Sequence, residues 1–255
     1  MDFLYKINSK LFTIFIIILI FILFEGLLCR PTQGIATYTP YIFCNKFLFK
    51  NFWYENGFVE NLQSIFLILS IFFLIRARKF YKTNKTINYF LIIHIICLIY
   101  YLGEEISWGQ HFLNWKSPDL FVSINNQKET NLHNISNLFD QLPRSIVLLW
   151  CTLTVPIILF INNFFHLNKD IIKILSPSKS LIKISILLLL FTIPDFIVDK
   201  LNLHPGHVDE NGTPIEGSYL YDIFTFNFIR LSELHELIFT FYFLSYSLAM
   251  NRIRY

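Results

Sequence analysis

The residues best suited to chemistry in this sequence are six acidic side chains that fall at one depth of a largely apolar chain. Each lies near the same end of a predicted membrane-spanning helix: Glu60, Glu104, Glu105, Asp195, Glu233 and Glu236. A carboxylate in hydrocarbon costs about 2.5–3.5 kcal/mol on insertion scales, and clustered like charges raise one another's pKa. We therefore expect these acids to converge in one cleft, where they share an ion, water or basic partners.

The polar residues around these acids indicate what such a cleft binds. Carboxylate and amide oxygens suit Mg²⁺, Ca²⁺ or Mn²⁺, and a histidine ligand adds Zn²⁺. We predict a divalent metal ion held by Glu60, Glu104, Asp195, Glu233 and Glu236. The predicted substrate-binding groups are Gln63, Ser107, Trp108, Gln110, Asn131 and Asn134. The alternative is a solvated interfacial rim, in which Arg144 and Arg230 pair with the acids.

Proton transfer is assigned to four residues: Glu104, Glu105, Glu129 and His133. Glu104 and Glu105 stand about 100° apart on a helix, so both reach a bundle interior only if the helix faces two neighbours or frays near Gly103. Glu105 is expected to share a helical face with Trp108. An imidazole beside carboxylates suits a proton carrier. Zinc ligation and simple capping of a helix N-terminus are the alternatives for His133.

The composition places these residues in a membrane. The 255 residues are 54% hydrophobic and 15% charged, with a mean hydropathy of +0.50, which is too little charge for a soluble surface. A helix crosses the hydrocarbon core with about 20 apolar residues. The windows that meet this length are 11–29, 58–75, 87–107, 145–165, 180–199 and 231–250. We predict one membrane domain over residues 1–255, an all-α polytopic transmembrane helix bundle of six spans.

The basic residues predict how the spans are oriented. Of the 21 Lys and Arg residues, most fall in the terminal segments and short connections of one side, which is the pattern of a cytoplasmic face. Both termini are then cytoplasmic, and the six acids lie at the extracytoplasmic face of a bacterial inner membrane. No charged block is long enough for a nucleic-acid-binding arm, so membrane lipid is the expected partner and nucleic acid is not.

The long outer loop after the third span is predicted to carry short interfacial helices. Ser117 can cap a short helix with Pro118 at its first position and Asp119 in its first turn. A second segment, 132–142, repeats apolar residues at helical spacing. We expect this segment to lie flat along the interface until Pro143 starts the fourth span.

Three runs in this region carry a resemblance. GEEISWGQ at 103–110, WKSP at 115–118 and NQKETNLHN at 126–134 resemble a family of bacterial polytopic membrane proteins whose function is not established. The similarity is close over 101–134 and looser at 55–63 and 233–236, so it implies that the outer residues form one set and implies no reaction. This chain has His111 where that family tends to have a basic residue.

A weaker similarity begins before the second span. Trp53-Tyr54-Glu55, followed by Glu60 and Ser64, resembles the opening motif of the alkaline ceramidase and progestin/adiponectin-receptor superfamily of intramembrane hydrolases, which implies hydrolysis. Those proteins have seven spans and histidine ligands at i, i+4 in a late helix, whereas this chain offers Glu233, His235 and Glu236 there.

We therefore expect a metal-assisted hydrolase or transferase that acts on a lipid or lipid-linked substrate at the outer face. A cation-coupled transporter is the main alternative, although no inverted repeat is visible and Pro156 and Pro194 are the main interruptions deep in the spans. A non-catalytic membrane scaffold is the third.

Overall fold

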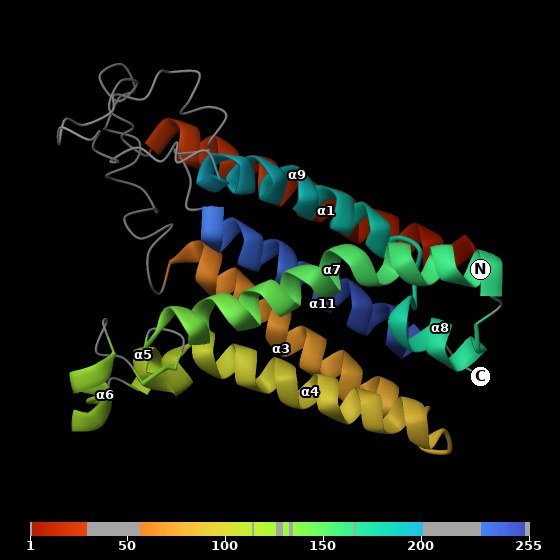
Figure 1. Cartoon of the computed structure of the whole chain (residues 1–255), viewed down its shortest axis with the longest axis horizontal. Helices are drawn as coiled ribbons and strands as arrows, with labels where there is room; N and C mark the ends of the chain where they lie inside the picture. The colour runs from red at the N-terminus through yellow and green to blue at the C-terminus, as the bar shows by residue number, and fades with distance from the viewer. Residues whose placement is uncertain are drawn as a thin grey trace.

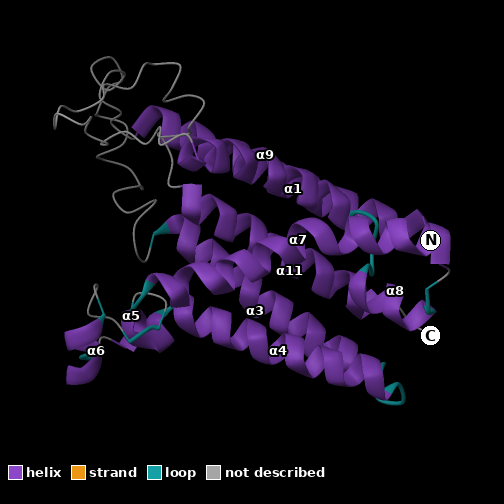
Figure 2. Cartoon of the chain, in the orientation of Figure 1, coloured by secondary structure: helices purple, strands orange, loops and turns teal. Residues whose placement is uncertain are grey.

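The computed structural model describes residues 2–29, 57–113, 115–125, 130–132, 135–165, 167–200 and 231–252. All regular secondary structure in those ranges is helical (Figure 2). The long helices are α1 (Asp2–Cys29), α3 (Phe58–Arg78), α4 (Lys85–Glu105), α7 (Asn137–Phe165), α9 (Leu181–Lys200) and α11 (Leu231–Arg252). The short ones are η1 (Ser107–Gly109), α5 (Gln110–Leu113), α6 (Asp119–Ile124) and α8 (Lys169–Leu175). Each of the predicted apolar windows is therefore helical.

The long helices run side by side along one axis, and the short helices lie at the two ends (Figure 1). Helix α1 begins and α11 ends at the end that carries α8, and the turn between α3 and α4 lies there too. We call this the basic end, because it holds Arg76, Arg78 and Lys79. Helices α5 and α6 lie at the opposite end, which we call the acidic end.

Among the residues that the structure describes, three helices are long and apolar enough to cross a membrane: α3, α4 and residues Gln141–Phe165 of α7. Their outward faces carry exposed large apolar side chains, for example Ile68, Ile96 and Ile157. Such faces need lipid rather than water around them. Length, composition and exposure therefore agree on a helical membrane protein.

Helix α11 is the core of the bundle. It packs most extensively against α3, and also contacts α9, α7 and α1. Every side chain from Leu234 to Met250 is buried except Glu236 and Leu248, which are partly buried. Phe241 stacks on Phe15 of α1 with ring centroids 3.7 Å apart. Because other helices enclose it, α11 tolerates polar side chains that a lipid-facing helix would not.

The outer loop differs from its prediction in two places. Helix α6 forms as expected, but Ser117 does not cap it: Pro118 is the N-cap residue, with no side-chain hydrogen bond. Ser117 instead donates to Gln110 Oε1 at 3.1 Å. The chain extends over 115–118 before α6, which turns the serine back toward α5 and away from the first-turn amides.

The predicted flat helix over 132–142 is also wrong, because its second half is the start of α7. One continuous helix runs from Asn137 through Pro143 and Pro156 to Phe165. Leu138, Leu142, Ile146 and Leu149 are all exposed and follow at helical spacing, so one apolar stripe continues across Pro143 without a change of phase. That shared stripe favours one helix over two.

Candidate functional site

Carboxylates from three helices meet at the acidic end of the bundle. Glu105 is the last residue of α4, Glu60 lies in the first turn of α3, and Glu233 and Glu236 lie in the first turns of α11. The charges of Glu236, Glu233 and Glu60 all act on the carboxyl of Glu105, that of Glu236 most strongly. We call these four residues, with Arg144 and Gln63, the carboxylate cluster.

Arg144 is the cation of this cluster. Its Nη2 atom forms an ion pair with Glu236 Oε1, and its charge also acts on Glu105. The Arg144 side chain is 30% exposed and that of Glu236 is 13% exposed, so the pair lies at the mouth of the bundle interior. The alternative prediction that Arg144 pairs with an acid is confirmed. Within the described residues of the cluster, one guanidinium lies among four carboxylates.

Gln63 lies beneath the carboxylates on α3 and is fully buried. Its Nε2 donates to the Glu233 backbone oxygen at 2.9 Å and lies 3.5 Å from Glu233 Oε2. Its Oε1 has no hydrogen-bond partner among the residues that the structure describes. A buried acceptor of this kind requires a donor. Carboxylates provide one only when they carry a proton, and water or a bound ligand provides one otherwise.

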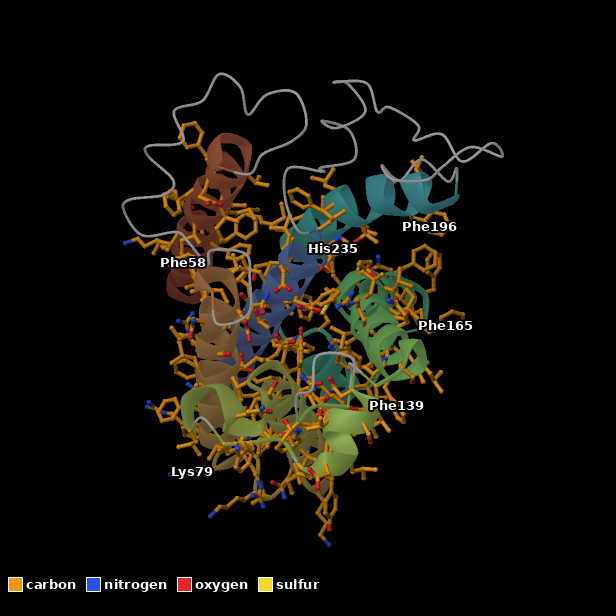
Figure 3. All side chains as sticks on the ribbon, turned by 90° about the vertical axis from the view of Figure 1, so that its left-hand side faces the viewer. Phe58, Lys79, Phe139, Phe165, Phe196 and His235 are labelled. Atoms are coloured by element: carbon orange, nitrogen blue, oxygen red, sulfur yellow. The ribbon has the colours of Figure 1, made fainter. Side chains whose placement is uncertain are left out.

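His235 lies in the interior, between α9 and α11, when the molecule is seen from the acidic end (Figure 3). Phe139, Phe165 and Phe196 lie at the periphery in the same view. The imidazole is 7% exposed and has a hydrogen bond with the backbone of Phe191 on α9. Its Nε2 atom is buried and has no partner in the described part of the chain.

Glu104 faces a different neighbour from Glu105. Its Oε1 accepts from Trp108 Nε1 at 2.9 Å, and its Oε2 accepts from the Leu132 backbone N–H at 2.6 Å. The two adjacent glutamates thus face two sides of α4: Glu105 faces the carboxylate cluster, and Glu104 faces the loop that follows the helix. The expected pairing of Trp108 with Glu105 is wrong, because α4 ends at Glu105 and the chain then turns back toward Glu104.

Further hydrogen bonds join the loop around residues 130–132 to the residues that follow α4. Asn131 donates to Ser107 Oγ at 3.0 Å, and Asn125 donates to Asn131 Oδ1 at 2.8 Å. Gln110 Oε1 accepts from the Thr130 backbone N–H at 2.8 Å. We call this network, together with Glu104 and Trp108, the outer clasp. It ties the loop to the end of α4.

The backbone of the clasp has an unusual conformation. Ser107 and Trp108 have φ values of 44° and 52°, and Gly109 follows at 91°. Left-handed conformations at two non-glycine residues cost energy, so the hydrogen bonds of the clasp must offset that cost. A Cβ atom on Gly103 would lie 2.9 Å from atoms of the Trp108 indole. Gly103 is therefore the residue that lets the indole fold back over α4.

The structure brings together some of the predicted site residues and not others. Glu60, Glu105, Glu233, Glu236 and Gln63 share the carboxylate cluster. The clasp contains Glu104, Ser107, Trp108, Gln110 and Asn131. Glu129, His133, Asn134 and the side chain of Asp195 lie outside the described residues. Among the described side chains, no group of three or more His, Cys, Asp or Glu residues could hold a metal ion.

Sequence reasoning missed one neighbour of the cluster. The charges of Glu105, Glu236 and Arg144 all act on the Tyr101 hydroxyl, which lies one helical turn below Glu105. The spacing of four residues on one helix was the available signal.

The fold and the site together define an all-helical protein with membrane-length helices and a carboxylate cluster at one end of the bundle. No protein-family model, curated protein or solved structure matches the chain.

Proposed function

We propose that this protein is a six-span inner-membrane enzyme, with both termini cytoplasmic, and that the carboxylate cluster is its acid–base centre at the extracytoplasmic face. The proposed substrate is a lipid or a lipid-linked molecule, because the cluster lies at one end of helices that are long and apolar enough to cross a membrane. The reaction class is hydrolysis or group transfer.

One observation carries this proposal: Glu105 lies beside the Arg144–Glu236 ion pair. Arg144 forms an ion pair with Glu236, whereas its charge is the weakest of those that act on Glu105, which lies among the carboxylates of Glu236, Glu233 and Glu60. Two acids in such different surroundings suit different protonation roles, which is how paired carboxylates work as acid and base. Glu105 is the proposed proton donor and acceptor, and Arg144 orients Glu236.

A divalent metal ion bound at these carboxylates would supply a Lewis acid or an activated water molecule. The described carboxylates do not form a ligand set for a metal, so we route no step through one. Metal content remains a separate measurement. Elemental analysis of the parent and of a Glu60→Gln, Glu233→Gln variant reports whether a metal binds at the cluster.

The proposed activity is tested with purified protein in nanodiscs that contain the lipid extract of its native host. Lipids are followed over time by mass spectrometry. We expect the parent to convert a lipid species, Glu105→Gln to abolish the conversion, and Asp119→Asn, which removes an exposed carboxylate on α6, to leave it unchanged. No conversion by the parent, or equal conversion by Glu105→Gln, contradicts the proposal.

The orientation is tested by fusing a reporter that is active only in the cytoplasm after Tyr255 and after Gly212. Activity at Tyr255 and none at Gly212 supports the cytoplasmic termini. The opposite result places the carboxylate cluster at the cytoplasmic face instead.

A further inference from the structure

A row of buried polar groups runs along α11 below the carboxylate cluster. His235, Tyr242 and Tyr246 follow at i, i+7 and i+11, which places them on one helical face, and all three are buried. The span from His235 to Tyr246 is about 16 Å at 1.5 Å per residue. These groups therefore extend the polar interior from the acidic end toward the basic end.

Neighbouring helices add polar groups beside this row. His94 of α4 stacks on Tyr246 with centroids 5.0 Å apart, and Trp150 of α7 lies 5.9 Å from His94. Tyr242 lies one helical turn before Tyr246 on α11. We call His235, Tyr242, Tyr246, His94 and Trp150 the polar row.

The row connects to both ends of the bundle. At the acidic end, His235 is the residue next to Glu236 on α11, and Tyr101 lies one helical turn below Glu105 on α4. At the basic end, the Tyr246 hydroxyl donates to the backbone oxygen of Ile174 in α8 at 2.5 Å. Ser247 and Asn251, one and five residues after Tyr246, continue the polar groups toward the end of α11.

Several atoms of the row, and of the two residues that continue it along α11, are buried without a hydrogen-bond partner in the described ranges: His235 Nε2, Tyr242 Oη, His94 Nε2, Trp150 Nε1, Ser247 Oγ and Asn251 Oδ1. An unsatisfied buried donor or acceptor costs about 1–3 kcal/mol. Native proteins avoid that cost with internal water, which bridges buried polar groups at such positions. Apolar side chains would pack this space without that cost. The hydroxyl and imidazole groups therefore indicate a role besides packing.

We propose that the polar row takes up water and conducts protons between the carboxylate cluster and the basic end. A carboxyl at the cluster releases a proton into the chain of hydroxyls and water. The imidazole of His94 accepts a proton on one nitrogen and releases one from the other, so charge and atoms balance. The membrane potential or a pH difference drives the net movement. This inference goes beyond the proposed enzyme and does not depend on its substrate.

Proton flux into vesicles tests the row directly. The full-length protein is reconstituted into phosphatidylcholine–phosphatidylglycerol vesicles that enclose a pH-sensitive dye, and a potassium gradient with valinomycin sets an inside-negative potential. We expect the parent to acidify the vesicles faster than protein-free vesicles, and Tyr242→Phe and His94→Phe to lose that difference. Tyr89→Phe removes an equivalent hydroxyl from the exposed face of α4 and should keep the parent rate.

Three results overturn the proposal: a parent rate equal to that of protein-free vesicles, an undiminished rate in both Tyr242→Phe and His94→Phe, or uptake of sodium ions at the rate of protons. If one row variant fails to fold, as judged by circular dichroism, the other carries the test. Loss of lipid conversion in Glu105→Gln has no bearing on these rates, so the enzyme proposal and the proton path fail separately.

Discussion

Trp108 Nε1 donates to Glu104 Oε1 at 2.9 Å, although a left-handed turn separates the tryptophan from the helix that carries the glutamate. The indole folds back over the end of α4 and covers Gly103. One carboxylate of the adjacent Glu104–Glu105 pair is thereby used to hold the outer clasp, while the other is available to the carboxylate cluster. The two neighbouring acids therefore have different roles, Glu104 in the outer clasp and Glu105 in the carboxylate cluster.

The first prediction concerns Gly103. Replacing it by alanine forces a Cβ atom against the indole at 2.9 Å, so we expect a loss of about 1–3 kcal/mol in the free energy of unfolding, as for overpacked sites. Urea titration in detergent measures the loss. The control is the same substitution in a Trp108→Ala background, where nothing obstructs the Cβ. Equal losses in both backgrounds would show that the indole does not occupy this space.

The second prediction separates the two oxygens of Glu104. Glu104→Gln can still accept from Trp108 but can no longer accept with both side-chain atoms, so the Leu132 N–H loses its partner. We expect faster hydrogen exchange at the Leu132 amide and a loss of about 1–3 kcal/mol in stability. Exchange followed by mass spectrometry reports both. An unchanged Leu132 rate would mean that the loop is held without Glu104.

The sequence alone predicted the helices and the meeting of several acids at one end of the bundle. Apolar windows of membrane length located the six long helices, and the acids at one depth located the acidic end. These features depend on local composition and period, which a sequence contains. The carboxylate cluster forms because four of these acids lie near helix ends that meet at the same end of the bundle: Glu60, Glu105, Glu233 and Glu236.

The partners of individual side chains were not predictable in the same way. Glu104 meets the Leu132 amide across 28 positions of sequence, and no period encodes that contact. The end of α4 depends on left-handed conformations at Ser107 and Trp108, which only the surrounding hydrogen bonds stabilise. Pro143 suggested that a helix begins there. The helix α7 instead runs through Pro143, because the same apolar stripe continues on both sides of it.

The third prediction concerns the ion pair at the mouth of the cluster. Arg144→Met leaves Glu236 without its guanidinium, and we expect a stability loss of about 1–3 kcal/mol, less than for a fully buried pair because Arg144 is 30% exposed. Adding Glu236→Gln should recover part of the loss. The double-mutant cycle is measured by urea titration.

The same ion pair predicts the sign of a pH effect. Arg144 acts on the carboxylates of Glu236 and Glu105 and attracts them only in their ionised forms, so the cost of Arg144→Met should be largest at neutral pH and should shrink as acidification protonates them. Stability curves of parent and variant are compared from pH 7 downward. A cost that is constant or grows on acidification would assign the role of Arg144 to packing.

The last prediction compares two buried tyrosines on one face of α11. The Tyr246 hydroxyl donates to the Ile174 backbone oxygen, so Tyr246→Phe leaves a carbonyl of α8 without this donor and should cost about 1 kcal/mol. Tyr242 has no such protein partner in the described ranges, so Tyr242→Phe should cost less than about 0.5 kcal/mol, because it breaks no hydrogen bond to a described protein group. Both variants remove one oxygen atom from equally buried rings, which makes each the control for the other. Thermal unfolding in one detergent measures the pair. A larger loss for Tyr242→Phe would show that its hydroxyl bonds a protein group, and would argue against water along the polar row.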